Sequence, residues 1–295
     1  MYLLLGHPLD ECCRSVSAAL QEHGRRAIIV QNPLTDPVQF AWRLEDRKST
    51  SRWVYDEWPG MLDEDISGVL VGSRGWIDPG EWAPEDAAYA QAEAQAALLA
   101  WLWSLPCPVV NRYSADGWYH THASLLSWHP LLHRAGLETP EMLVTSDVDS
   151  AWAFGGPRGA VLNTLTGGSA YLVKTDADWT GLAELQRRIP VWLSRPHGAA
   201  QSVCVVGERV VWDGVPPTRA RAREEALRRF ASSADLAFVE LALAPVDGRL
   251  CAVAVEDQPR LERFGAFARR EIVDGLVALL TWEGSRSIRP EARGS

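Results

Sequence analysis

Short apolar runs alternate with polar stretches along the first part of the chain. Three of these runs have the length of a buried strand: residues 2–5, 27–30 and 66–72. Between the first two lies a segment with helical periodicity, residues 10–23, and Asp10 at its start is a favourable N-cap residue. Strands that alternate with helices are typical of parallel α/β domains, so we expect such a domain at the N-terminus.

Residues 84–104 have the most regular helical pattern of the chain. They begin with a proline and acidic residues, are rich in alanine, and contain no internal glycine or proline. An apolar strand candidate follows at 107–112. Another helix is expected over 124–135, where Gly136 and then Pro140 end the pattern. After Pro140 the pattern of apolar and polar residues changes from helical segments to short apolar runs, which indicates a domain boundary nearby.

The rest of the chain consists mainly of short apolar runs separated by glycine-containing turns, a pattern typical of antiparallel strands. The strand candidates are residues 142–145, 160–165, 170–174, 190–193, 202–206, 209–213, 236–243 and 250–255. Two helices are expected among them, at about 218–232 and at about 260–283. Residues 286–295 are rich in Arg, Ser, Gly and Pro and have the composition of a loose tail.

Three segments occur in a fixed order in this region, and none of them would indicate a protein family by itself. Their marker residues, in chain order, are Gly136, Pro140 and Thr145, then Gly167 and Gly168, and then Glu240. Together with the hairpin sequence SVCVVGE at 202–208, this order resembles the ATP-grasp superfamily, in the branch that includes glutathione synthetase-like and ribosomal-peptide-maturation ligases. The resemblance covers roughly residues 105–283.

The resemblance implies both a fold and an activity. The fold would be an N-terminal parallel α/β domain at 1–112, followed by an ATP-grasp fold of two α+β subdomains at 113–189 and 190–285. The activity would be the ATP-dependent ligation of a carboxylate to an amine through an acyl phosphate, with ATP and Mg²⁺ bound. A small molecule or a peptide of a biosynthetic pathway would be the substrate.

Carried over position by position, the resemblance also implies a site. Glu240 matches the first acid that holds magnesium, and Glu256 offers a second. Magnesium prefers such hard oxygen ligands, shared with the phosphates of the substrate. The residues implied in nucleotide binding are Asn163, Gly167, Gly168, Lys174, Val191, Leu193 and Arg195. The glycine pair would cover the triphosphate, and the strand at 190–194 would offer main-chain groups to adenine.

The sequence departs from the family pattern at the lysines that normally contact the phosphates of ATP. One of these lysines falls on Asn163, and the arginine expected in the hairpin falls near Ser202. The cations nearest to the expected phosphate site are Arg158, Lys174 and Arg195, and arginine binds phosphate with a different geometry. A lost charge-assisted hydrogen bond costs about 1.5–3 kcal/mol. The loss of several would therefore weaken ATP binding by orders of magnitude.

The missing lysines leave two hypotheses open. In the first, the chain is a ligase in which Arg158 acts at the transferred phosphate and Arg74, just after the third strand, orients the substrate. In the second, it is a non-catalytic ATP-grasp-like protein that binds a peptide or protein partner. The fourteen tryptophans bear on this choice, because several, such as Trp53 and Trp82, fall in polar segments where an exposed indole is costly. Core packing is the alternative interpretation of these indoles.

Composition excludes several other classes of protein. The formal net charge of −9 argues against a nucleic-acid partner, which requires a cationic face. No apolar run approaches the roughly 20 residues of a membrane span. The five cysteines have neither disulfide nor metal-site spacing, so we expect a soluble, cytoplasmic protein. A homodimer is left open.

Four histidines lie close together in the sequence: His120, His122, His129 and His133. The last two are one helical turn apart, a spacing found in zinc sites. Pro130 follows the first of this pair directly, which indicates that His129 lies at a helix start. A metal site, a phosphate-facing role and a surface location all remain open for the group.

Overall fold

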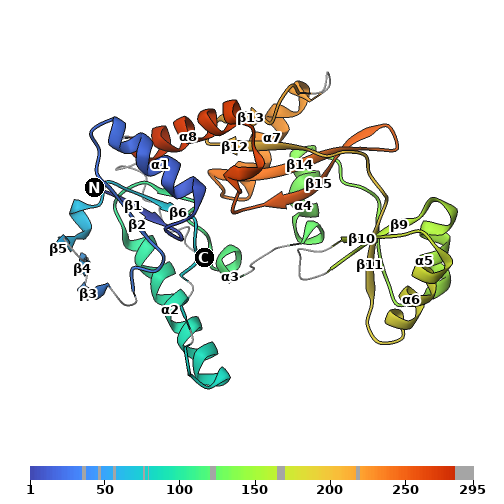
Figure 1. Cartoon of the computed structure of the whole chain (residues 1–295), viewed down its shortest axis with the longest axis horizontal. Helices are drawn as coiled ribbons and strands as arrows, with labels where there is room; N and C mark the ends of the chain where they lie inside the picture. Colours follow the sequence, from blue (N-terminus) through green and yellow to red (C-terminus); the bar gives the residue numbers. More distant parts are fainter. Residues whose placement is uncertain are drawn as a thin grey trace, which may run out of the picture. The chain divides into compact units, whose positions relative to one another are not determined.

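The computed structural model describes residues 1–34, 38–45, 48–55, 58–75, 77–78, 80–119, 124–164, 170–216 and 220–282 (Figure 1). The chain divides into two compact units. Unit 1 comprises Met1–Tyr119, Asp235–Phe238 and Arg260–Ser295, and unit 2 comprises His120–Ala234 and Val239–Pro259. The predictions for Gly167, Gly168, His120, His122 and the tail at 286–295 lie outside the described residues.

Unit 1 contains the expected parallel sheet. Its strands, in spatial order, are β2 (Ala27–Val30), β1 (Tyr2–Leu5), β6 (Gly68–Val71) and β7 (Val109–Val110). All neighbouring pairs are parallel. The residues of β1 and β6 are buried throughout, as expected for strands covered on both faces. The N-terminal α/β prediction is therefore confirmed.

Two helices from opposite ends of the sequence pack beside each other in unit 1. Helix α1 (Glu11–Glu22) begins at Asp10, whose Oδ1 accepts from the Cys13 N–H at 2.7 Å, so the predicted N-cap is confirmed. Helix α8 (Ala266–Thr281), after the short turn η4 (Leu261–Arg263), contacts α1, β6 and β7. The sequence predicts α8 as part of the C-terminal subdomain. The structure places it in unit 1, because its apolar face is buried there.

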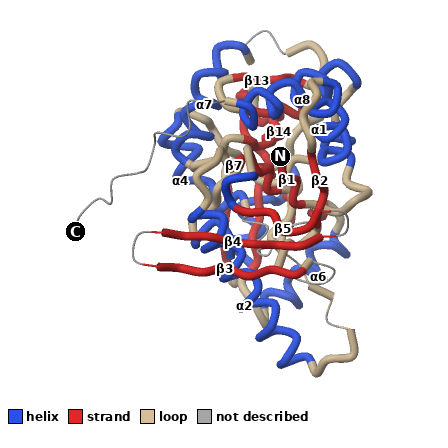
Figure 2. The backbone as a smooth tube through the Cα atoms, turned by 90° about the vertical axis from the view of Figure 1, so that its left-hand side faces the viewer, coloured by secondary structure: helices blue, strands red, loops and turns tan. Residues whose placement is uncertain are grey.

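A three-stranded antiparallel sheet in unit 1 has no counterpart among the predicted elements. It consists of β3 (Gln39–Glu45), β4 (Lys48–Tyr55) and β5 (Trp58–Leu62), which lie side by side in Figure 2, with the turn η1 (Asp63–Asp65) after them. Helix α2 (Pro84–Ser104) brings Trp101 to this sheet, where its indole donates to Ser51 Oγ at 3.1 Å. Trp53 is fully buried and packs edge-on against Trp101, with ring centroids 6.0 Å apart. Trp53 is therefore a core residue, which confirms the core-packing interpretation of this indole and excludes it from an exposed binding surface.

The first part of unit 2 is a four-stranded antiparallel sheet. Its order is β10 (Ala170–Val173), β9 (Ala160–Asn163), β11 (Val191–Ser194) and β8 (Met142–Thr145). Helices α5 (Val148–Gly155) and α6 (Asp176–Gln186) supply Ala151, Trp179 and Leu182 to a core that also contains Leu193. We call this part the small subdomain. The turn η2 (Gly156–Arg158) connects α5 to β9.

The other part of unit 2 is a second antiparallel sheet. Its order is β13 (Arg209–Trp212), β12 (Gln201–Val206), β14 (Phe238–Val246) and β15 (Arg249–Glu256). Helix α4 (Leu125–Ala135) contacts β15 and α7 (Glu224–Ser233), with Trp128 edge-on to Phe230 at 5.8 Å. The turn η3 (Arg221–Arg223) precedes α7, and α3 (Ala115–Tyr119) belongs to unit 1. No helix in the described ranges is long and apolar enough to cross a bilayer.

Candidate functional site

Two glutamates predicted as metal ligands lie opposite each other on neighbouring strands. In the antiparallel register of β14 and β15, Glu240 faces Glu256. Residues paired in this way have Cβ atoms about 4.5–5.5 Å apart and point to the same face of the sheet. The structure therefore brings together the two carboxylates that the sequence placed sixteen positions apart.

The surroundings of Glu240 hold its carboxylate in place. Only 2% of the residue is exposed, and the Ser202 hydroxyl donates to Oε1 at 3.0 Å. Ser202 lies on the neighbouring strand β12, at the position where the family pattern has an arginine. Cys204 lies two residues further along β12, where burial and then the charge of Glu240 raise the pKa of its thiol. Ser202 is a site residue that sequence reasoning recognised only as a missing arginine.

The glutamate pair has the chemistry that magnesium requires. Carboxylate oxygens are hard ligands, and Mg²⁺ at nucleotide sites uses one or two of them together with phosphate oxygens and water. Within the parts of the chain that the structure describes, no three His, Cys, Asp or Glu side chains converge. The pair therefore fits a magnesium ion that shares its ligands with a nucleotide, rather than one enclosed by protein groups.

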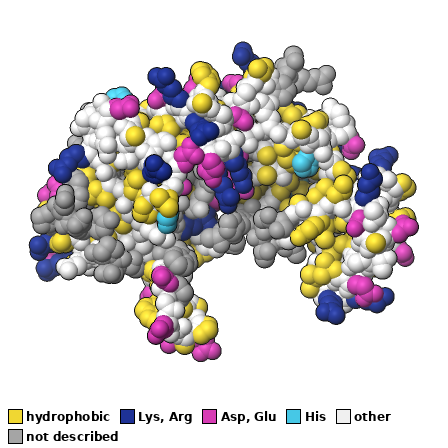
Figure 3. Space-filling view, in the orientation of Figure 1, with side chains coloured by type: hydrophobic (Ala, Val, Ile, Leu, Met, Phe, Trp, Pro, Cys, Tyr) yellow, Lys and Arg dark blue, Asp and Glu magenta, His cyan; other side chains and the backbone are white. Residues whose placement is uncertain are grey.

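Helices α5 and α6 pack on one face of the sheet of the small subdomain, and neither packs on the other, which we call its uncovered face. The helix-covered face contains Val191 and Leu193, so both of these side chains lie in the core. The residues of the uncovered face are Met142, Val144, Val161, Asn163, Ala170, Leu172, Trp192 and Ser194. Val144 is 47% and Leu172 58% exposed, and Figure 3 shows hydrophobic side chains gathered over this subdomain. This apolar face has the character needed to bind a planar base.

Asn163, which replaces a lysine of the family pattern, lies on this uncovered face. Its Nδ2 donates to Val161 O and to Ser194 Oγ, both at 3.0 Å. Beside it in the register is Trp192, which is buried and whose Nε1 has no acceptor among the described residues. The indoles of Trp53, Trp118 and Trp179 likewise lack an acceptor among the described residues, and each packs edge-on against an aromatic ring. The Trp192 indole is therefore a buried part of this sheet rather than an exposed group.

Two of the predicted phosphate contacts lie at the same end of the β9–β10 hairpin. Arg158 ends the turn before β9 and Lys174 follows β10, and both side chains are exposed. Asn163 lies at the other end, because it pairs with Ala170 next to the turn. Three residues of strand separate the two ends, a distance of about 10 Å. Arg158 and Lys174 therefore lie at the opposite end of the hairpin from Asn163, and a contact between either cation and phosphate stays a prediction.

The Arg195 side chain binds other residues of the small subdomain. Its Nε and Nη2 are each 2.9 Å from Glu141 Oε2, its Nη1 donates to Phe154 O, and its guanidinium lies 4.3 Å from the centroid of the Phe154 ring. Only 19% of the side chain is exposed. These contacts tie the end of β11 to α5. A contact between Arg195 and phosphate stays a prediction, and it would require these bonds to be exchanged.

Arg74, predicted to orient the substrate, is buried in unit 1. Its guanidinium lies 4.6 Å from the centroid of the Tyr113 ring, and Nη1 donates weakly to Trp118 O at 3.4 Å. The loop around it is fixed by Gly75, whose carbonyl accepts from Asn32 and Gln91. Arg74 thus follows β6 as expected, and its contact with a substrate stays a prediction.

Of the four neighbouring histidines, His129 and His133 lie within the residues that the structure describes. The His129 and His133 rings lie on α4 with centroids 6.2 Å apart, and His129 Nδ1 is 2.8 Å from Thr139 Oγ1. Helix α4 begins at Leu125 and contains Pro130, so the prediction that His129 marks a helix start was wrong. The segment around Pro130 stays helical because α4 packs against α7 and β15.

No protein-family profile matches the sequence, and no curated protein sequence is significantly similar to it. Solved structures, in contrast, are similar over nearly the whole chain. The macrocyclase MdnC of Microcystis aeruginosa MRC, bound with its precursor peptide MdnA, has a TM-score of 0.74 at 14% identity, over 95% of this chain and 98% of that chain.

Two structures described as ATP-grasp ligases are similar to the same extent. The RiPP-associated ligase of Chryseobacterium gregarium, in complex with ADP and a leader and core peptide, has a TM-score of 0.70 at 14% identity, over 95% of this chain and 96% of that chain. PsnB, complexed with a phosphomimetic variant of its minimal precursor, Mg and ADP, has a TM-score of 0.72 at 16% identity, over 94% and 98%. The chain therefore has the ATP-grasp fold that the resemblance implied, including the N-terminal domain.

Proposed function

We propose that this protein is an ATP- and magnesium-dependent ligase that joins a carboxylate to an amine on a peptide substrate. The observation that carries the proposal is the pairing of Glu240 with Glu256 across β14 and β15. Two carboxylates paired in this way supply the hard oxygen ligands that a magnesium ion shared with nucleotide phosphates takes.

Each part of the proposed site has a separate role. Glu240 and Glu256 would hold Mg²⁺, which neutralises phosphate charge when it is bound. Ser202 fixes the orientation of Glu240 through the bond to Oε1. The uncovered face of the small subdomain would bind the base through its exposed apolar side chains, Val144 and Leu172. Asn163 would stand near the phosphates as a neutral hydrogen-bonding group.

The proposed reaction balances without any other reactant. A carboxylate of the substrate takes the γ-phosphate of ATP and releases ADP, and the amine nitrogen then displaces the phosphate to form the amide. Holding carboxylate, amine and nucleotide together provides most of the acceleration in such reactions. Arg158 and Lys174, which are both exposed in the small subdomain, are the cations that we propose for contact with the phosphates.

A peptide is the substrate class that the comparisons favour. MdnC, the Chryseobacterium gregarium ligase and PsnB were all solved with precursor peptides. We propose by analogy that the present chain also modifies a ribosomally made peptide. Arg74 and the residues around it at the end of β6 would lie close to that peptide.

Calorimetric titration of ATP with Mg²⁺ tests the proposal directly. We expect binding at micromolar concentrations, and a loss of about 10- to 100-fold in Glu240→Gln and in Glu256→Gln, since each variant removes one charge-assisted contact of about 1.5–3 kcal/mol. Glutamine preserves the shape and the bond from Ser202. Glu208→Gln, at an exposed turn on the same sheet, is the matched control and should bind like the wild type. Equal binding by all four proteins would refute the metal role of the pair.

The second candidate function is a non-catalytic protein that binds a peptide. The bonds from Arg195 to Glu141 and Phe154 favour this second candidate, because a cation expected to contact phosphate already binds protein groups. A folded protein that binds a precursor peptide and shows no heat of binding with ATP and Mg²⁺ would support this candidate over the ligase.

A further inference from the structure

Two exposed histidines on α4 have no role in the proposed ligase reaction. His129 and His133 are four residues apart, so they lie about one turn apart on the same face of the helix. Their ring centroids are 6.2 Å apart. No other ring contact between two histidines occurs among the described residues. On the described surface, this pair is therefore where two imidazoles can act on one ligand.

The separation of the two rings is close to that of two imidazoles on one metal ion. An imidazole nitrogen binds zinc at about 2.0–2.1 Å, which puts the ring centroid about 3 Å from the ion. Two such rings lie about 5–6 Å apart, depending on the angle at the metal. Both side chains are exposed, so a small rotation about their side-chain bonds brings the observed 6.2 Å into this range. The rings can therefore share an ion without a change in the helix.

A hydrogen bond determines which nitrogen of His129 would face a metal ion. Its Nδ1 lies 2.8 Å from Thr139 Oγ1. When Nδ1–H donates to this hydroxyl, the lone pair of Nε2 is available to the ion. Histidines that bind metals usually have such a partner on the other ring nitrogen, which orients the ring and sets its tautomer. The His133 side chain has no hydrogen bond or ion pair with another described residue, so either of its nitrogens can turn toward the ion.

The packing of α4 holds the two histidines in a fixed relation. The helix contacts α7 and β15, and Leu132 and Ala135 on its inner side are buried. Pro130, between the histidines, restricts the backbone further because its ring fixes φ. The helix is therefore formed without an ion, and an ion would not have to order it. A site on such a rigid element loses less entropy on binding.

We infer that His129 and His133 bind a divalent transition-metal ion. Imidazole nitrogen suits Zn²⁺, Ni²⁺ and Cu²⁺, whereas Mg²⁺ and Ca²⁺ prefer oxygen ligands. Two histidines at positions i and i+4 of a helix have the spacing that lets both bind one ion. No third His, Cys, Asp or Glu converges on them within the described residues, so water would fill the remaining positions. The inference is independent of the proposed ligase activity, because its ligands and its metals differ from those of the glutamate pair.

Calorimetric titration of the untagged full chain tests the inference. The probes are the chlorides of Zn²⁺, Ni²⁺ and Cu²⁺, with excess MgCl₂ in the buffer to occupy carboxylate sites. We expect one tightly bound ion per chain, and Cu²⁺ should bind more tightly than Ni²⁺ or Zn²⁺. His129→Ala and His133→Ala should each lower the affinity at least tenfold. Thr139→Val, which removes the hydrogen-bond partner of His129, should lower it about tenfold.

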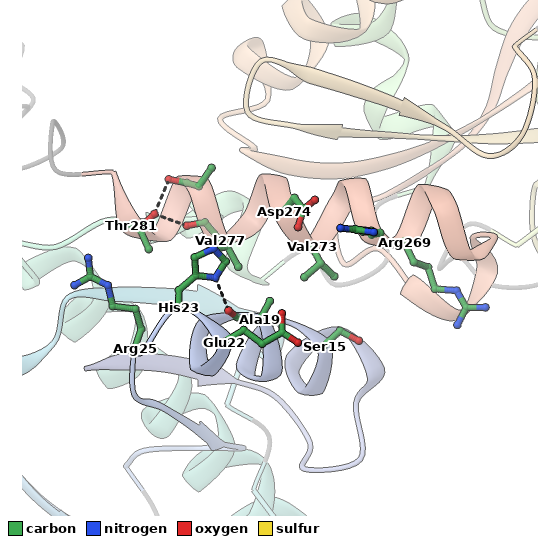
Figure 4. A pocket seen from close by; sticks show the side chains of 12 residues that line it. Ser15, Ala19, Glu22, His23, Arg25, Arg269, Val273, Asp274, Val277 and Thr281 are labelled. Carbon is green, nitrogen blue, oxygen red and sulfur yellow. Dashed lines mark hydrogen bonds between the residues drawn. The ribbon is translucent and has the colours of Figure 1, made fainter.

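A spacing variant separates binding by the pair from adventitious binding to single histidines. In His133→Ala combined with Arg134→His, the number of histidines is unchanged, but the second ring moves about 100° around the helix. The affinity should stay as low as in His133→Ala, although one positive charge has been removed. His23→Ala is the control and should bind like the wild type. The His23 ring lies 2.7 Å from Ala19 O through Nδ1, and the side chains around it in Figure 4 include no second histidine.

Each result decides between the pair and the alternatives. Circular dichroism confirms that every variant is folded. A wild type that shows no heat of binding with any of the three ions up to about 1 mM would overturn the inference. Equal affinity in His133→Ala, or restored affinity in the spacing variant, would also overturn it, because single histidines would then account for the binding.

Discussion

A buried asparagine in unit 1 provides a sharp test of how the strand that carries Glu240 is positioned. Asn111 is 2% exposed, donates from Nδ2 to Phe238 O at 2.7 Å, and accepts from Phe238 N at 2.8 Å. Phe238 is the first residue of β14, two positions before Glu240. Asn111 also has a φ of 58°, in the left-handed region that asparagine tolerates better than most residues.

Replacement of Asn111 by alanine should lower the free energy of unfolding of unit 1 by about 3–8 kcal/mol. Each of the two lost bonds leaves a buried backbone group of Phe238 without its partner, at about 1–3 kcal/mol per group. The left-handed backbone adds about 1–2 kcal/mol for alanine. Glycine relieves this strain but gains entropy in the unfolded state, about 0.4–1 kcal/mol. Asn111→Gly should therefore be more stable than Asn111→Ala by about 0.5–1 kcal/mol.

Urea unfolding followed by tryptophan fluorescence measures these differences, and hydrogen exchange at the Phe238 amide reports the local bond. The amide should exchange faster in both variants than in the wild type. A loss of less than about 1 kcal/mol in Asn111→Ala, or unchanged protection of the Phe238 amide, would refute the reasoning from unpaired buried groups.

Two further predictions follow from single side chains. Burial raises the pKa of the Cys107 thiol to about 11 from an ordinary value of 9.0, so the native state retains a proton that the unfolded state releases. The free energy of unfolding should therefore fall by about 2 kcal/mol as the pH rises from 9 to 11, and a Cys107→Ala variant with the same pH profile would contradict this. Arg195→Ala should destabilise the small subdomain by about 1–3 kcal/mol, because the Phe154 carbonyl loses its donor. Calorimetric titration of this variant with ATP and Mg²⁺ separates a structural role of Arg195 from a phosphate contact. A large loss of ATP affinity with little loss of stability would identify a phosphate contact instead.

Local patterns were sufficient for most of the secondary structure. The capped helix after Asp10, the alanine-rich helix at 84–104 and the paired strands of unit 2 were all predictable, because each depends on periodicity and turn residues within a few positions. The sheet of β3, β4 and β5 was missed. Its strands mix polar and aromatic residues, and they are ordered by contacts such as the one between Trp101 and Ser51, which are 50 positions apart.

The same distinction between local patterns and contacts of distant residues applies to the candidate site. Glu240 and Glu256 were predicted as metal ligands, but their pairing did not follow from the turn. The register at the turn, with Val246 opposite Arg249, would bring Val255 opposite Glu240, and the shift between Ala242 and Leu243 brings Glu256 there instead. The partners of the predicted cations were not predictable either. Arg195 binds Glu141, 54 positions away, and Arg74 lies over Tyr113. A sequence shows that a guanidinium is present, but it does not show which of several acceptors the fold brings to it.

By itself, the sequence determined the strands of the parallel sheet and of unit 2, the long helices, and the order of segments that resembles the ATP-grasp superfamily, because these depend on neighbours along the chain. The tertiary structure alone decided that α8 belongs with α1, that Trp53 is buried, and that Asn111 holds Phe238 across 127 positions. Those contacts form only when distant segments pack together, and packing is governed by shape and burial rather than by spacing in the sequence.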